Sequence, residues 1–285
     1  MVNLPKVTLT GPALLFLVGA ASTVVFLAGV FRCASEGGWN REDRAGFGGN
    51  TSSGCGANTA YALCTGLFSM LVVGGFLLAA LGNASCASKA APVVGVFLML
   101  WWTVAALVLT FDGPFVVVSN GYLGSWLSCV AAFVYALEVS PLFHRVAIEV
   151  SGEAEKVTRH MLLMVVASII ELVAAALGCG RGGCSDYWAY ATAVGAVSLF
   201  LCSVLIVGPK LAAMDRLVKP ICLFLALFWF VALVILTFVA PFVLASNGFW
   251  ATWIACIASG LIAYDAFSGQ PTASSGVVAH PANGP

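Results

Sequence analysis

Long runs of apolar residues, separated by short polar segments, dominate the hydrophobic pattern of the chain. Eight of these runs approach or exceed the ~20 apolar residues that cross a bilayer. They occupy residues 11–32, 60–82, 92–118, 121–142, 161–178, 187–208, 221–245 and 249–268. The runs lack the period-2 alternation of barrel strands, so we expect an all-α membrane protein with eight transmembrane helices. We expect the first run to be retained; the alternative is a cleaved signal peptide.

The composition agrees with an integral membrane protein. Hydrophobic residues make up 61% of the 285 residues and charged residues 8%, against roughly 45–50% and about 25% in a soluble domain. The formal net charge is zero, which argues against a nucleic-acid partner. We therefore expect the lipid bilayer to be a partner, together with the protein itself or other membrane proteins.

The lysine and arginine residues fall mostly into one set of loops. With the N-terminus inside, the inner segments hold eight of them and the outer loops hold four. Cytoplasmic loops carry an excess of these residues in membrane proteins, so we predict that both termini are cytoplasmic. The predicted location is the plasma membrane or a membrane of the secretory pathway.

Each of two predicted outer loops holds one pair of cysteines. Cys33 and Cys55 flank the first outer loop, and Cys179 and Cys184 flank the loop after the fifth run. Disulfides need an oxidising compartment, so we predict one disulfide in each loop. The alternative is unpaired thiols.

Asn50 begins an Asn-Thr-Ser sequon in the first outer loop, which predicts glycosylation.

The second half of the chain repeats the first. A shift of 127 residues places Phe97–Ser140 on Phe224–Phe267, and farther upstream a shift of 129 places Cys55 on Cys184. Such self-similarity indicates a duplicated unit of four spans. Because four is even, both copies should have the same orientation, as parallel repeats. We predict a first repeat over residues 1–142, a cytoplasmic linker over 143–160, a second repeat over 161–268 and a flexible cytoplasmic tail over 269–285.

The most similar stretches are "TFDGPFVVVSNGYLGSW" and "TFVAPFVLASNGFWATW". The proline removes a backbone hydrogen bond to the threonine carbonyl, which predicts a kink, and the threonine hydroxyl can satisfy a local backbone group. Asn-Gly should end the helix, Ser or Asn can cap the next one, and the tryptophan should lie at the membrane interface. The alternative is a ligand site with the asparagines as polar contacts. The residues of this hairpin motif are Thr110, Pro114, Asn120, Gly121 and Trp126, and Thr237, Pro241, Asn247, Gly248 and Trp253.

Four acidic residues within or near the ends of the spans are candidates for function, because ionisable groups in membranes are costly. Glu171 is the deepest, and it aligns with Val25, so one copy alone carries it. It can bind a cation, relay protons, join the two halves through a hydrogen bond or pack as a protonated side chain. Asp112 lies near the outer end of the third run. Glu138 and Asp265 are equivalent residues near inner helix ends, where we expect contacts with loop Lys or Arg or with a partner.

Motifs for catalysis, metal binding or nucleotide binding are missing from the sequence. The three histidines are scattered, and neither CxxC, HExxH, GxSxG nor a phosphate-binding loop in a suitable context occurs. We therefore expect a protein that is not an enzyme and that holds neither a metal ion nor a cofactor.

A unit of four spans with inner termini, a cysteine pair in the first outer loop and a long, proline-bent third span resembles two tetraspan families. These are the claudin and peripheral myelin protein family and the MARVEL family. The resemblance is architectural, since Trp39 is the one tryptophan between Cys33 and Cys55, where claudins have a longer tryptophan signature. It implies work in shaping membranes, sealing junctions or trafficking vesicles.

Together these features predict a non-enzymatic multi-pass protein that organises membrane, or builds a larger membrane assembly, by lateral self- or hetero-association. Two similar units in one chain offer two similar edges for such contacts. The alternative is a channel or transporter for a small ion or solute that uses Glu171 and Asp112.

Overall fold

The computed structural model describes residues 11–35, 55–145, 159–207 and 215–268, and these residues form an all-α structure. Eight helices in the described ranges are long and apolar enough to cross a membrane, which confirms the predicted all-α multi-pass fold. The main helices are α1 Gly11–Ser35, α2 Ala57–Gly82, α3 Ala84–Leu107, α4 Asn120–Val139, α6 Arg159–Gly182, α7 Asp186–Val207, α8 Asp215–Val234 and α9 Asn247–Ser268. Two short π-helical turns, η1 Val108–Asp112 and η3 Ile235–Val239, extend α3 and α8.

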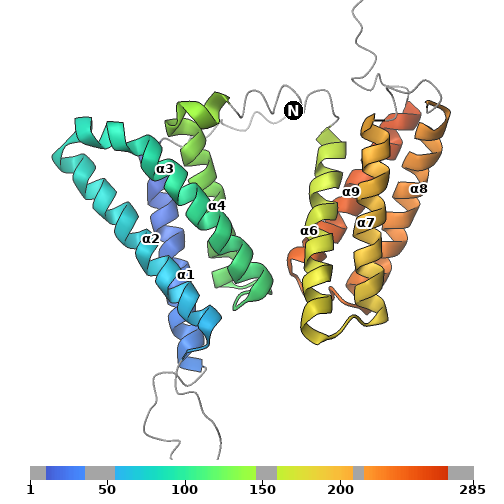
Figure 1. Cartoon of the computed structure of the whole chain (residues 1–285), viewed down its shortest axis with the longest axis horizontal. Coiled ribbons are helices and arrows are strands. Elements are labelled where there is room, and N and C mark those ends of the chain that lie inside the picture. The colour runs from blue at the N-terminus through green and yellow to red at the C-terminus, as the bar shows by residue number, and fades with distance from the viewer. Residues whose placement is uncertain (1–10, 36–54, 146–158, 208–214, 269–285) are drawn as a thin grey trace, which may run out of the picture. The chain divides into compact units, whose positions relative to one another are not determined.

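The chain divides into two compact units, which we call unit 1 (Met1–Ala147) and unit 2 (Ile148–Pro285). Each unit is a four-helix bundle (Figure 1). In unit 1, α1 packs against α2 and α4, and α3 also packs against α2 and α4. In unit 2, α6 packs against α7 and α9, and α8 against the same two helices. The first and last helices of a unit are therefore neighbours, and the four helices close a ring.

The predicted linker over 143–160 is described only at its two ends. Residues 141–145 form a helical turn after α4, and residues 159 and 160 already belong to α6. The remainder of the linker and the predicted tail over 269–285 lie outside the described residues.

The third helix of unit 1 is displaced from its predicted position of 92–118, because it begins and ends earlier. It begins at Ala84, where the side chain of Asn83 accepts a hydrogen bond from the backbone N–H of Cys86 at 3.0 Å and caps the helix. It ends in η1 at Asp112. The apolar residues that follow are in an irregular connection that reaches Ser119.

The predicted kink at Pro114 is wrong, because the proline lies beyond the helix. The backbone N–H of Gly113 donates to the Val108 carbonyl at 3.1 Å, which closes the π turn one residue before the proline. Since a proline has no N–H to donate, it fits at a point where the helix has already ended. The hydroxyl of Thr110 donates to the Ala106 carbonyl at 2.7 Å, as a local backbone contact of the predicted kind.

Unit 2 ends its third helix in the same way. The N–H of Ala240 donates to the Ile235 carbonyl at 3.1 Å, and the Thr237 hydroxyl donates to the Leu233 carbonyl at 2.7 Å. Pro241 follows directly, again outside the helix.

The Ser-Asn-Gly segments begin the fourth helices and do not end the third, which corrects the predicted stop. Ser119 Oγ accepts from the Tyr122 N–H at 3.3 Å and caps α4. Asn120 and Gly121 are the first two residues of α4. A Cβ at Gly121 would lie 2.5 Å from the Phe115 ring, so this glycine permits a close approach between the connection and the helix. Asn247 and Gly248 begin α9 in the same way.

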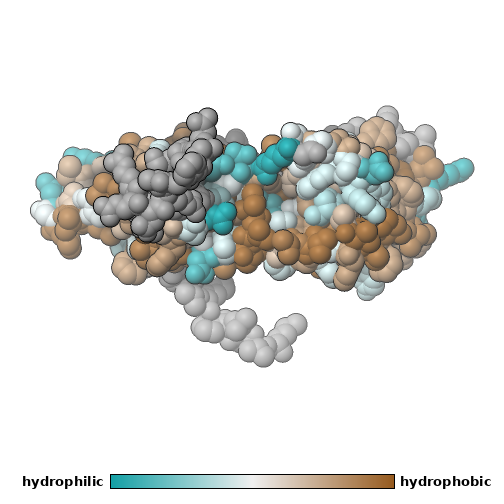
Figure 2. All heavy atoms as spheres, turned by 90° about the horizontal axis from the view of Figure 1, so that it is seen from below, coloured by the Kyte–Doolittle hydropathy of each residue, from teal (hydrophilic) through white to brown (hydrophobic). Residues whose placement is uncertain are grey.

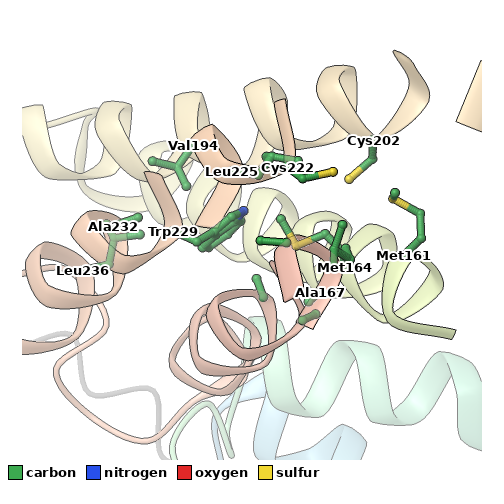
Figure 3. Packing of buried hydrophobic residues seen from close by; sticks show 14 of the residues in the cluster. Met161, Met164, Ala167, Val194, Cys202, Cys222, Leu225, Trp229, Ala232 and Leu236 are labelled. Atoms are coloured by element: carbon green, nitrogen blue, oxygen red, sulfur yellow. The ribbon is translucent and has the colours of Figure 1, made fainter. Parts of the chain in front are cut away.

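Large apolar side chains are exposed on the outside of both bundles. Phe16, Leu78 and Phe200 are each about two-thirds or more exposed, as suits side chains that face lipid. Figure 2 shows one face of the molecule, on which apolar residues cover a large part of the described surface. The interior of unit 2 packs around Trp229, which is fully buried (Figure 3).

Candidate functional site

A chain of buried indole and hydroxyl groups joins three helices of unit 1. Trp102 Nε1 on α3 donates to Ser69 Oγ on α2 at 2.9 Å. Ser69 Oγ lies 2.9 Å from Ser22 Oγ on α1, and Ser22 Oγ donates to the Val18 carbonyl at 2.6 Å. All three side chains are fully buried. We call this arrangement the hydroxyl–indole node.

Unit 2 contains the same node. Trp229 Nε1 on α8 donates to Ser198 Oγ on α7 at 3.0 Å, and Ser198 Oγ lies 2.8 Å from Ser168 Oγ on α6. Ser168 Oγ donates to the Met164 carbonyl at 2.8 Å. A polar group in a membrane core needs an internal partner, and here each hydroxyl and indole supplies one for its neighbour. The node therefore fixes how three helices of each bundle face one another.

The alignment of the repeats contains a signal for this node. The shift that places Cys33 on Cys179 also places Ser22 on Ser168, and the shift that places Cys55 on Cys184 places Ser69 on Ser198. The shift of 127 residues places Trp102 on Trp229, so all three members of the node recur at equivalent positions.

Glu138 and Asp265 both contact the beginning of the first helix of their own unit. Glu138 Oε1 accepts from the backbone N–H of Gly11, the first residue of α1, at 3.0 Å. Asp265 Oδ2 lies 2.8 Å from Nδ1 of His160, the second residue of α6. These partners differ from the Lys and Arg residues that the sequence suggested. A helix N-terminus presents free N–H groups and favours a nearby carboxylate, which explains why both copies keep an acid here.

Asp112 is the exposed last residue of η1, and it faces the start of α2. Nδ2 of Asn58 donates to the Asp112 backbone carbonyl at 3.2 Å and lies 3.4 Å from its carboxylate Oδ2. Asp112 therefore connects the C-terminal end of the third helix to the second helix. The aligned residue of unit 2, Val239, is apolar and exposed.

Glu171 lies in the interior of unit 2, with none of its surface exposed. Among the described residues, neither carboxyl oxygen has a hydrogen-bond partner. A Cβ at Gly195 of α7 would lie 2.6 Å from Glu171 Oε2, so the carboxyl group packs directly against the α7 backbone. Val25 occupies the equivalent buried position of unit 1. Glu171 belongs to unit 2, where it is buried within the bundle, whereas Asp112 belongs to unit 1 and is exposed.

Both predicted cysteine pairs form disulfide bonds in the structure. Cys33 is joined to Cys55, and Cys179 to Cys184. The glycosylation candidate Asn50 lies outside the described residues.

The hairpin asparagines do not form equivalent polar sites. Asn120 is exposed, whereas the aligned Asn247 is buried. The two asparagines therefore lie in different surroundings, and the ligand-site alternative stays a prediction. The tryptophans of the motif, Trp126 and Trp253, are each half-buried in the first two turns of the fourth helix.

Models of known protein families, curated protein sequences and solved structures gave no match to the chain. The site is therefore interpreted from its own geometry. Within the described ranges, the structure contains no group of three or more His, Cys, Asp or Glu side chains that could hold a metal ion.

Proposed function

We propose that the protein is a non-enzymatic multi-pass membrane protein that organises membrane, or builds a larger assembly, through lateral contacts of its two units. In this proposal its partners are other copies of itself or other membrane proteins. The plasma membrane or the secretory pathway is the proposed location, because the chain carries outer disulfides and a predicted outer sequon.

The observation that carries the proposal is a partly exposed aromatic pair on the third helix of each unit. The rings of Phe97 and Trp101 on α3 stack with centroids 5.9 Å apart, and those of Phe224 and Phe228 on α8 stack at 5.4 Å. These pairs align at the shift of 127 residues. Phe97 is 38% exposed and Phe224 is 50% exposed, so part of each pair remains available for contact.

Aromatic pairs of this kind suit lateral association. Helices in lipid associate by close packing, and aromatic side chains are enriched at protein interfaces. One chain that presents two similar faces can contact two neighbours, and contacts that do not close into a ring produce chains or arrays. Four-span architecture with an outer cysteine pair supports the proposed likeness to the tetraspan families of membrane-organising proteins.

The buried hydroxyl groups support a role other than catalysis. Ser69 and Ser198 are fully buried, and each lies within hydrogen-bonding distance of an indole and a second hydroxyl. A nucleophilic hydroxyl has to reach a substrate, whereas these groups are occupied in holding helices together.

The test is the number of subunits in a bilayer. The full-length protein, labelled once per chain, is reconstituted into liposomes at low density and counted by stepwise photobleaching. We expect dimers and larger species, and fewer of them for a variant with Phe97→Leu and Phe224→Leu. The control Phe16→Leu replaces an exposed phenylalanine of α1 that aligns with Leu162, and it should leave the distribution unchanged. Monomers throughout, or an equal effect of the control, would contradict the proposal.

A channel or transporter is the second candidate, favoured by one observation. Glu171 is a fully buried carboxyl with both oxygens unpartnered among the described residues, and such groups in membranes often serve ion or proton pathways. In this case liposomes that contain the protein should pass protons or cations, and Glu171→Gln should abolish the flux. Flux no greater than in empty liposomes would exclude this function.

A further inference from the structure

Four sulfur-bearing side chains come together in the core of unit 2. Met161 and Met164 are on α6, Cys202 is on α7 and Cys222 is on α8. They belong to one buried cluster, and their exposed fractions are 9%, 0%, 0% and 2%. Figure 3 shows the side chains of Cys202 and Cys222 pointing toward one another, with those of the two methionines beside them. We call these residues the sulfur cluster.

The duplication supplies an internal comparison for the sulfur cluster. By the shifts that align the two repeats, its four positions correspond in unit 1 to Leu15, Val18, Val73 and Gly95. These four residues are also buried. Unit 1 therefore packs the same positions without a single sulfur atom. Methionine and cysteine can serve as ordinary packing residues, but packing of this fold does not require them here.

We propose that the sulfur cluster of unit 2 binds one soft monovalent metal ion, with Cu(I) as the ion that best fits its ligands. Thiolate and thioether donors favour Cu(I), whereas hard cations such as Mg²⁺ and Ca²⁺ prefer oxygen. Two cysteines and two methionines from three helices provide up to four such donors. This inference is independent of the proposed lateral assembly.

The charge of the complex suits a buried site. A cysteine thiol that coordinates Cu(I) releases its proton to water and binds as a thiolate, with no change in oxidation state. One thiolate and one Cu(I) together carry no net charge, and the two methionines add neutral thioether donors, while the second cysteine stays a protonated thiol beside the ion. A neutral complex avoids the cost of burying an unpaired charge.

The position of the cluster also suits a reduced metal ion. Met161 is the third residue of α6, at the end of unit 2 that we predict to be cytoplasmic, and it is the most exposed of the four. Cys179 and Cys184, near the opposite end of α6, form a disulfide, whereas Cys202 and Cys222 are free. Free thiols persist on the reducing side of a membrane, where copper is present as Cu(I).

The experiment measures copper that resists a chelator. Full-length protein in detergent, kept reduced with a phosphine, is loaded with Cu(I) and dialysed against the Cu(I) chelator bicinchoninate. Copper per chain is then determined, and the ligands are identified by X-ray absorption. We expect one retained Cu(I) with sulfur ligands in the wild-type protein.

The matched variant carries unit 1 residues at three positions and the smallest side chain at the fourth: Met161→Leu, Met164→Val, Cys202→Val and Cys222→Ala. It should retain no copper. A control variant with Cys64→Ala and Cys256→Ala alters free cysteines outside the cluster, and it should retain one copper per chain.

A milder variant keeps the test decisive if the fourfold replacement fails to fold. Met161→Leu with Met164→Leu preserves apolar volume, and it should weaken copper binding at least tenfold while the Cys179–Cys184 disulfide still forms. Three results would each overturn the proposal. These are no chelator-resistant copper in the wild type, equal copper in the wild type and either cluster variant, and a disulfide between Cys202 and Cys222 in protein that is purified without any reductant.

Discussion

Replacing Ser198 by alanine should reveal how much the hydroxyl–indole node contributes to unit 2. Ser198 Oγ accepts from Trp229 Nε1 at 3.0 Å and lies 2.8 Å from Ser168 Oγ. Ser198→Ala removes both contacts at once. Ser168 keeps its bond to the Met164 carbonyl, but the Trp229 indole N–H loses its partner in a fully buried position.

The size of the effect follows from these contacts. Hydrogen bonds between membrane helices average about 0.6 kcal/mol, so the loss of two gives a lower value of about 1.2 kcal/mol. A buried donor left without a partner costs about 1–3 kcal/mol. We therefore expect Ser198→Ala to lower the free energy of unfolding by about 1–3 kcal/mol, or roughly 5- to 150-fold in the unfolding equilibrium constant.

The assay is reversible unfolding in mixed micelles with increasing dodecyl sulfate. Ser203→Ala is the matched control, because Ser203 is an exposed serine on the same helix whose hydroxyl bonds only the Leu199 carbonyl of its own turn, at 2.8 Å. Trp229→Phe completes a double-mutant cycle with Ser198→Ala, and the coupling between the two changes should be at least about 0.5 kcal/mol. A coupling of zero, or equal losses for Ser198→Ala and Ser203→Ala, would refute this account of the node.

Two further predictions concern helix contact and orientation. Gly195→Ala should destabilise the protein by about 1–3 kcal/mol in the same assay, because its Cβ would lie 2.6 Å from Glu171 Oε2. Gly74→Ala has open space around its Cβ and should be neutral or slightly stabilising; equal losses would argue against a tight α6–α7 contact. Asn83 also begins a sequon, Asn-Ala-Ser, which follows the second run and is therefore predicted on the inner side, opposite Asn50. In a glycosylating host, Asn50→Gln should reduce the mass by one glycan and Asn83→Gln should not. A glycan on Asn83 would reverse the predicted orientation.

The fold class was predictable because a membrane leaves few alternatives. A segment that crosses lipid has to satisfy its backbone internally, so long apolar runs without alternation become helices. The ends of the third helices were less predictable. Hydropathy continues through Phe115 and Val118, yet these residues lie in an irregular connection. Apolar character reports where a residue can be buried, and it does not report its backbone conformation.

The partners of polar residues were the least predictable part. A serine in a helix has several possible neighbours, and which one it meets depends on how the helix is rotated. Ser69 contacts Trp102 and Ser22 because α2 lies between α1 and α3 in the closed bundle. Glu138 accepts a hydrogen bond from one backbone N–H at the start of a helix, and such a partner is not identified by any side chain in the sequence.

The contact between the end of the fourth helix and the start of the first has a consequence for how such a protein can arise and be engineered. Glu138 with Gly11, and Asp265 with His160, hold the two chain ends of each unit at one corner. A module whose ends are adjacent can be copied in tandem through a short connector, without changing the order or the neighbours of its helices. By the same geometry, unit 1 can be opened at Asn83, between α2 and α3, and rejoined at its old ends. Such a circular permutant would retain every pair of neighbouring helices.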